Sequence, residues 1–256
     1  MMGKIMLTAD CSTHVHVSRH DLTFTAEQLK GICKGVCYYE EPITKVMPSE
    51  RKETSWAVSN VLGEAKQVNQ KLRRAYRLVP ETTWAPLFKI LGKITLKTVQ
   101  DTLARTSRGD DRYLSWNFEN ITQPCGTIEF RRPPAVASAA DACHWAAFSV
   151  GFIARAMGAD WTRIESLNTV GSVAELRKFV AQGVEILGPT CVGALIEAKL
   201  VEDFSPAQVL TPAELEDIEQ KKLEKNTKNS PFVEKASSRP SSPALSVASL
   251  ASLRAC

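Results

Sequence analysis

Three short segments of the chain alternate polar and apolar side chains, residue by residue. They span residues 12–18, 112–118 and 126–131. Because successive side chains of a β-strand point to opposite faces, each segment is predicted to be a strand with one polar face and one apolar face. Such strands fit an antiparallel sheet that packs one face against a core. The chain is therefore predicted to build its core on one side of this sheet.

Segments with a helical spacing of apolar residues lie between and after these strands. They span residues 25–39, 86–105, 138–157 and 173–187. Thr25 can cap the first helix, because Gln28 stands at the position that a capping box uses. Gly188 and Pro189 end the last one. We expect an α+β fold in which these helices cover the apolar face of the sheet.

The composition is that of a globular chain with a core, since 44% of the 256 residues are hydrophobic and 23% are charged. The net charge of +4 is too small and too dispersed to indicate nucleic-acid binding. No apolar run approaches the roughly 20 residues of a membrane span, and the first residues lack the apolar core of a secretory signal. Seven scattered cysteines with no C-x-x-C pair favour free thiols. We expect a cytoplasmic protein with no nucleic-acid or membrane partner.

The composition changes after residue 203. Residues 203–225 include a highly charged stretch with few apolar side chains, which predicts a solvated helix. Residues 226–256 are rich in Ser, Pro, Ala and Lys, which predicts disorder, because such a segment cannot bury enough apolar surface to fold. The chain is thus predicted to contain one domain over residues 1–202, a charged helix over 203–225 and a disordered tail over 226–256.

The polar faces of the three predicted strands carry side chains that can bind metal ions and phosphate. They are His14 and His16 on the first strand, Tyr113, Ser115 and Asn117 on the second, and Thr127, Glu129 and Arg131 on the third. Solvent exposure explains such a face on any single strand. Two histidines, a glutamate and an arginine together fit a shared cleft better, because imidazole and carboxylate bind divalent cations and arginine binds phosphate. This combination is typical of phosphoryl transfer.

Two other metal-binding patterns also begin with two histidines on one strand. Barrel metal hydrolases need further histidines and a late aspartate, whereas only His20 and His144 remain here. His144 lies in an apolar helix, which favours a role in the core. A cupin needs a glutamate soon after the histidine pair, and none stands at that offset.

Four segments resemble, in the right order, the motifs of the amidoligase family, whose members are carboxylate–amine ligases related to glutamate–cysteine ligases and glutamine synthetase. Residues 11–17 (CSTHVHV) are similar to the family's CGLHVHV strand, and residues 126–131 (GTIEFR) to its gTiEFR strand. Residues 39–42 (YEEP), followed by Arg51, resemble its yEp…R stretch. Residues 112–117 (RYLSWN) resemble its RY..lN strand.

The resemblance implies ATP-dependent formation of an amide bond, in which a carboxylate is phosphorylated to an acyl phosphate that an amine then attacks. It implies ATP and Mg²⁺ as cofactors, and a small-molecule carboxylate and amine as substrates. The fold it implies is the C-terminal part of a glutamine-synthetase-like domain. Matching positions give the implied roles: metal ligands His14 and Glu129, a catalytic Arg131 that stabilises the transferred phosphoryl group, and substrate or nucleotide contacts His16, Arg51 and Asn117.

The chain also departs from the family pattern. The family places an E-x-E strand before the histidine strand to complete its metal cluster, whereas only the first residues of this chain precede that strand. The E-x-E at residues 214–216 lies in the charged helix, where residues two apart do not share a face. Ser12 and Thr13 replace the family's Gly-Leu.

These departures favour the C-terminal part of an amidoligase whose activity is impaired unless another chain supplies the carboxylates that Mg²⁺ requires. An unpaired sheet edge favours a homo-oligomer. The alternative is a non-catalytic amidoligase-like protein, either one that retains nucleotide or small-molecule binding or one that acts through its tail as an interaction protein.

Overall fold

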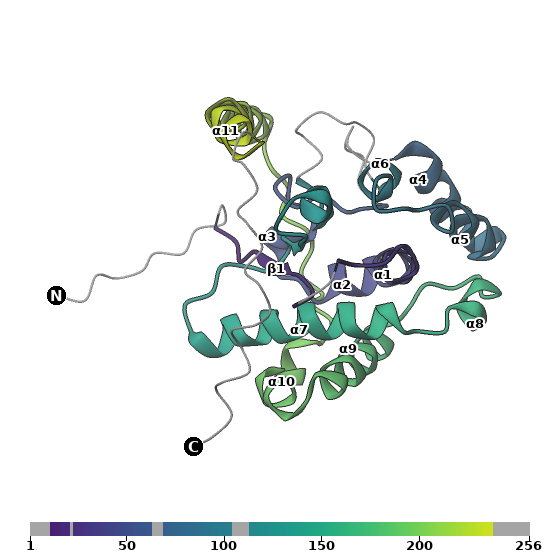
Figure 1. Cartoon of the computed structure of the whole chain (residues 1–256). Helices are drawn as coiled ribbons and strands as arrows, with labels where there is room; N and C mark the ends of the chain where they lie inside the picture. The colour runs from purple at the N-terminus through teal and green to yellow at the C-terminus, as the bar shows by residue number, and fades with distance from the viewer. Residues whose placement is uncertain (1–10, 21–22, 63–68, 104–112, 238–256) are drawn as a thin grey trace, which may run out of the picture. The chain divides into compact units, whose positions relative to one another are not determined.

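A computed structural model describes residues 11–20, 23–62, 69–103 and 113–237 (Figure 1). The chain divides into two compact units, residues 1–209 and residues 210–256. The first unit holds the sheet and the described helices α1 to α10, and the second holds α11 (Pro212–Ser237).

The three predicted strands form one antiparallel sheet in the order β1-β3-β2. Each is shorter than predicted: β1 is Val15–Val17, β2 is Trp116–Asn117 and β3 is Ile128–Phe130. Residue 112, where the second predicted strand begins, lies outside the described residues. The expected α+β class and the antiparallel sheet are confirmed.

The apolar face of the sheet packs against α7 (Ala139–Met157), one of the four helices that were predicted to cover it (Figure 1). Phe130 of β3 stacks between Trp116 of β2 and Phe148 of α7, at ring-centroid distances of 4.3 and 5.5 Å. Trp116 also stacks on Phe152, one helical turn further along α7, at 5.0 Å. Stacked aromatic rings bury large apolar areas, so this column fixes the sheet on the helix.

The predicted helix starts are confirmed by their capping contacts. α1 (Ala26–Tyr38) begins with a capping box in which Thr25 accepts a hydrogen bond from the Gln28 backbone and Gln28 accepts one from the Thr25 backbone. α9 (Val173–Leu187) begins with the same box, formed by Ser172 and Glu175. It ends at Gly188, whose φ of 99° favours glycine because a side chain would be strained there.

The single helix predicted over residues 86–105 is wrong. The described part forms two helices, α5 (Ala85–Leu91) and α6 (Val99–Leu103), and residues 104–105 lie outside the described residues. α5 ends at Gly92, and the Thr95 backbone N–H donates to the Thr98 hydroxyl in a turn before α6. Apolar residues on both helices are buried in the same core, so their spacing imitates one continuous helix.

Short elements complete the first unit. The helices are α2 (Glu40–Lys45), α3 (Ser49–Lys52), α4 (Gln70–Arg77), α8 (Thr162–Glu165) and α10 (Pro189–Ala194), and the 3₁₀ turns are Val79–Glu81, Glu119–Thr122 and Glu197–Lys199. α7 packs against α9 and α1 as well as the sheet (Figure 1).

His144 of α7 takes the core position that the sequence favours. It is fully buried, and its Nδ1 accepts a hydrogen bond of 3.1 Å from the Ile196 backbone N–H. Burial, helped by the nearby Lys199 ammonium, lowers the pKa of His144 to about 4, so the imidazole is neutral at pH 7.

In the second unit, α11 continues to Ser237, past residue 225 where the charged helix was expected to end. The part of the expected tail over residues 238–256 lies outside the described residues. None of the described helices is long and apolar enough to span a membrane.

Candidate functional site

The carboxylate of Glu129 is the centre of a cluster on the polar face of the sheet. Its Oε1 accepts hydrogen bonds from His14 Nδ1 and Arg131 Nη1, each at 2.9 Å, and lies 3.4 Å from His16 Nε2. Its Oε2 accepts a hydrogen bond of 2.9 Å from Asn117 Nδ2. The convergence predicted from the alternation of the three strands is confirmed, whereas the chemical roles of these residues stay predictions.

The register of the sheet produces this convergence. β3 lies between the other two strands, and Glu129 stands opposite His16 on one side and Asn117 on the other. Residues opposite each other on one face are close enough for their side chains to touch. The position of Glu129 in the middle strand therefore gives its carboxylate neighbours from all three strands.

The histidines are on the open side of the cluster. The side chain of Glu129 is 5% exposed, whereas those of His14 and His16 are 35% and 45% exposed. The Ser12 hydroxyl lies 2.9 Å from His14 Nε2, and the Thr127 hydroxyl lies 3.2 Å from His16 Nδ1. Because His14 Nδ1–H donates to Glu129, the other ring nitrogen, Nε2, can accept a hydrogen bond from the Ser12 hydroxyl. A ligand would therefore reach Glu129 past the imidazoles.

Glu129 is ionised despite its burial. Burial by itself raises the pKa of the carboxyl group, but hydrogen bonds from His14 and Asn117 and the charge of Arg131 outweigh it and hold the pKa at about 2. The cluster thus keeps a buried negative charge beside a positive one at every pH in the physiological range.

The depressed pKa of Glu129 predicts a loss of stability in acid. The unfolded chain takes up the proton at its ordinary pKa of 4.5, before the folded one does. The contribution of Glu129, about 3 kcal/mol, is therefore complete above pH 4.5 and falls away as the pH drops towards 2. Urea unfolding of the wild type and Glu129→Gln between pH 6 and 2.5 measures it. The free energies of unfolding of the two proteins should converge in acid. A difference between them that stays constant with pH would contradict the prediction. Glu27→Gln, at an exposed position, is the control.

A second, buried cluster supports the strand end that carries Arg131. Arg132 Nη1 donates to Glu40 Oε1 at 2.7 Å, and both residues are 1% exposed. Arg132 also donates to the Arg51 carbonyl at 3.2 Å and to the Lys52 carbonyl. The Glu40 carboxylate further accepts a hydrogen bond from the Asn60 backbone N–H. Glu40 therefore fixes Arg132 from one side and the backbone of α3 fixes it from the other.

Arg51 belongs to this buried cluster. It is fully buried, and it donates to the backbone carbonyls of Arg131 and Arg132 at 2.8 and 3.0 Å. Burial first, and then the charge of Arg132, lower the pKa of Arg51 to about 10. The Arg51 guanidinium therefore binds the backbone that follows β3 and not the Glu129 carboxylate. The predicted substrate contact of Arg51 stays a prediction, whereas Asn117 does join the Glu129 cluster.

Sequence reasoning missed the roles of Glu40 and Arg132. Glu40 stood inside the matched segment YEEP, and Arg132 directly follows the matched segment GTIEFR. Alternation put Arg132 on the apolar face, where an arginine needs a buried partner. An arginine at a position predicted to face the core therefore indicated that a buried acidic residue would pair with it, but not which one.

The donor set of the Glu129 cluster does not by itself fit Mg²⁺. Among the described residues, no three or more His, Cys, Asp or Glu side chains are arranged to hold a metal ion. Both oxygens of the Glu129 carboxylate already accept hydrogen bonds, one of them from a guanidinium. Mg²⁺ prefers octahedral oxygen ligands, and one carboxylate with two imidazoles does not supply them.

Comparison with known proteins gives one family. The model of a family described as "Putative amidoligase enzyme" matches residues 2–153, more than half of the chain. This range contains all four segments that resemble amidoligase motifs, together with the Glu129 cluster and Arg132. No curated protein and no solved structure matches the chain. On the extent of the family match, the chain belongs to this amidoligase family.

Proposed function

We propose that the protein is a ligase that joins a small carboxylic acid to an amine at the expense of ATP, and that its activity is impaired unless further carboxylates are supplied to its site. In that chemistry a carboxylate oxygen attacks the γ-phosphorus of ATP, ADP leaves, and the amine nitrogen then displaces phosphate from the acyl phosphate. The observation that carries the proposal is the Glu129 carboxylate contacted at once by His14 and Arg131 in a member of an amidoligase family.

Arg131 is the group best suited to a phosphoryl oxygen. Its Nη1 is held by Glu129 and its Nε donates to the Trp56 carbonyl at 3.5 Å, while its Nη2 has no hydrogen-bond partner among the described residues. The guanidinium also lies 5.6 Å from the ring centre of Tyr113. A positioned donor that faces developing negative charge stabilises the transition state without reorganising.

ATP and Mg²⁺ are the proposed cofactors, and the carboxylate oxygens that Mg²⁺ lacks in the described cluster would have to come from outside it. The same shortage favours the second candidate, a non-catalytic amidoligase-like protein. In that case the Glu129 carboxylate links the three strands through His14 and Asn117, and Arg131 only neutralises its charge.

The isolated chain is expected to bind ATP with Mg²⁺ weakly, with a Kd of about 1 mM or above, and to show little or no turnover. The reason is the small oxygen donor set of the Glu129 cluster. Isothermal titration with ATP and MgCl₂ measures the binding. An ADP-release assay over a panel of amino acids and amines measures the turnover.

Four variants separate the outcomes. Glu129→Gln and His14→Ala remove members of the cluster, whereas Glu27→Gln and His20→Ala remove the same groups from exposed positions elsewhere. Fast turnover that only the first two variants abolish would contradict the expected weak activity and establish an active ligase. No ATP binding in the wild type would favour the non-catalytic candidate.

A further inference from the structure

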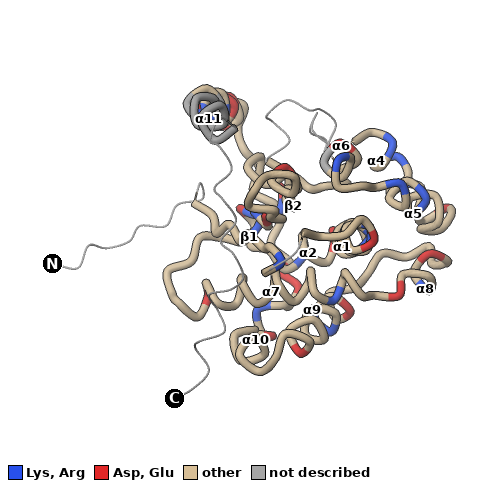
Figure 2. The backbone as a smooth tube through the Cα atoms, viewed as in Figure 1, with Lys and Arg blue, Asp and Glu red and all other residues tan. Residues whose placement is uncertain are grey.

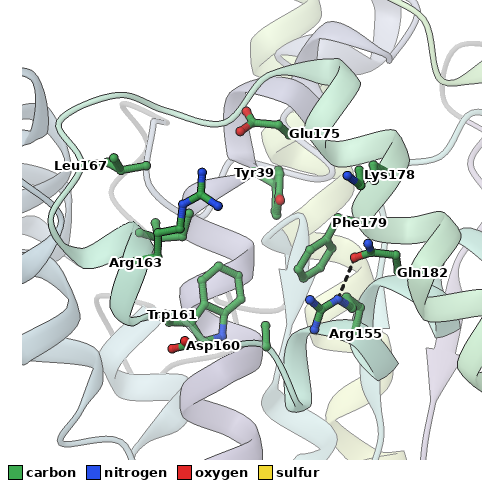
Figure 3. A pocket seen from close by; sticks show the side chains of 12 residues that line it. Tyr39, Arg155, Asp160, Trp161, Arg163, Leu167, Glu175, Lys178, Phe179 and Gln182 are labelled. Atoms are coloured by element: carbon green, nitrogen blue, oxygen red, sulfur yellow. Dashed lines mark hydrogen bonds between the residues drawn. The ribbon is translucent and has the colours of Figure 1, made fainter.

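A pocket separate from the Glu129 cluster lies among the C-terminal end of α1, the end of α7, α8 and α9 (Figure 3). Its volume is about 340 Å³, within the range of small-molecule sites. None of the residues around Glu129 lines it.

Aromatic side chains form the apolar part of this pocket. Tyr39, Trp161 and Phe179 are 6–7% exposed. The rings of Tyr39 and Phe179 lie 4.8 Å apart, and those of Trp161 and Phe179 lie 5.8 Å apart. The small exposed parts of these rings, with the lining side chains of Ile164 and Leu167, give the pocket an apolar surface that a flat apolar molecule can contact.

The Tyr39 hydroxyl supplies a hydrogen-bond donor. Figure 3 shows it pointing towards the middle of the pocket, and it makes no hydrogen bond to any described residue. Burial, with the neighbouring Tyr38 and Glu175, raises the pKa of Tyr39 above its ordinary value, so the hydroxyl keeps its proton at neutral pH.

Positive side chains surround the aromatic part. Arg163 of α8 and Lys178 of α9 lie on opposite sides of Tyr39 in Figure 3 and make no ion pair within the described parts of the chain. Arg155 of α7 lies 5.6 Å from the ring centre of Phe179, and its Nε donates to Gln182 at 3.0 Å. That contact aligns the guanidinium and leaves its Nη groups for another acceptor.

The two carboxylates at the pocket are engaged in hydrogen bonds to residues two or three positions away in the sequence. Asp160 accepts hydrogen bonds from the Thr162 backbone and hydroxyl at 3.0 and 2.6 Å. Glu175 accepts bonds from the Ser172 backbone and hydroxyl at 2.8 and 2.9 Å. They neutralise none of the three cations directly, so the pocket retains unpaired positive charge beside an apolar surface.

We propose that this pocket binds a small molecule with a flat apolar body and one anionic group, such as an aromatic carboxylate. The body packs on Phe179 and Trp161, and the anion lies between Arg163 and Lys178 and accepts the Tyr39 hydroxyl proton in a hydrogen bond. This site shares no residue with the Glu129 cluster, so its binding can be tested without the ligase reaction.

Isothermal titration of the full chain with 1-naphthoate tests the proposal, and 1-naphthamide is the uncharged probe with the same ring system. We expect naphthoate to bind about tenfold or more tightly than the amide, and its affinity to fall as salt is added. Inorganic phosphate, which has charge but no apolar body, should bind more weakly than naphthoate. Equal affinities for naphthoate and naphthamide would overturn the proposal. So would the absence of any heat of binding at a naphthoate concentration of about 2 mM.

Charge-removing variants locate the site. Arg163→Gln and Lys178→Gln should each weaken naphthoate binding about fivefold, the worth of one partly exposed charge contact. Arg177→Gln removes the same charge from the exposed neighbour of Lys178, which does not line the pocket, and should change the affinity little. Tyr39→Phe should weaken binding without unfolding the chain, which its thermal unfolding will show. An equal effect of Arg177→Gln and Lys178→Gln would place the anion elsewhere and overturn the assignment.

Discussion

Replacing Arg132 by methionine is expected to lower the free energy of unfolding by about 3–5 kcal/mol. The substitution leaves the carboxylate of Glu40, which is 1% exposed, without its ion-pair partner. It also removes the donors that the Arg51 and Lys52 carbonyls accept. An uncompensated buried charge is costly, because nothing in the interior replaces the water that would solvate it. Urea unfolding at pH 7 measures the loss.

The double variant Glu40→Leu with Arg132→Met separates the cost of the orphaned charge from the worth of the pair. With both charges gone, much of the lost stability should return, because a buried ion pair contributes little more than apolar packing. Lys30→Met is the surface control: Lys30 pairs with an exposed Glu27, and its loss should cost about 1 kcal/mol or less. If Arg132→Met also lowered the free energy of unfolding by only about 1 kcal/mol, the buried pair would not be needed for stability.

Gly183→Ala is expected to destabilise the first unit by about 3 kcal/mol, at the upper end of the cost of overpacking. A Cβ at residue 183 of α9 would lie 1.8 Å from the Gly151 carbonyl oxygen and 2.5 Å from its carbon on α7. Both atoms belong to the backbone, so the two helices would have to move apart. The gain in helix propensity from alanine, about 1 kcal/mol, is too small to offset this.

The matched control is Gly193→Ala on α10, where a Cβ would meet no atom within 4 Å. It should leave the stability unchanged or raise it by up to about 1 kcal/mol. Urea unfolding of both variants at pH 7 gives the comparison. Equal stabilities of the two variants would contradict the close approach of α7 and α9 at their glycines.

Local signals in the sequence were enough for the elements around the site. The alternation of residues 126–131 determined which face Glu129 occupies, because a strand allows only two. Thr25 with Gln28 fixed the start of α1 through contacts only three residues apart. Where two helices shared one core, as in α5 and α6, the apolar spacing could not reveal the break between them.

By itself, then, the sequence determined the three strands, their polar faces and the set of residues that can meet there, since period and capping depend on neighbours along the chain. The order and register of the strands came from the tertiary structure. Only the tertiary structure decided which groups are actually paired. Arg132 and Glu40 are far apart in the sequence, as are Gly151 and Gly183, and no local pattern encodes their contact. The pocket of Tyr39, Trp161 and Phe179 likewise exists only because α1, α7, α8 and α9 pack together. Burial in the packed structure also shifts the pKa values of groups such as Glu129 and Tyr39, because it removes the water that would solvate their charged forms.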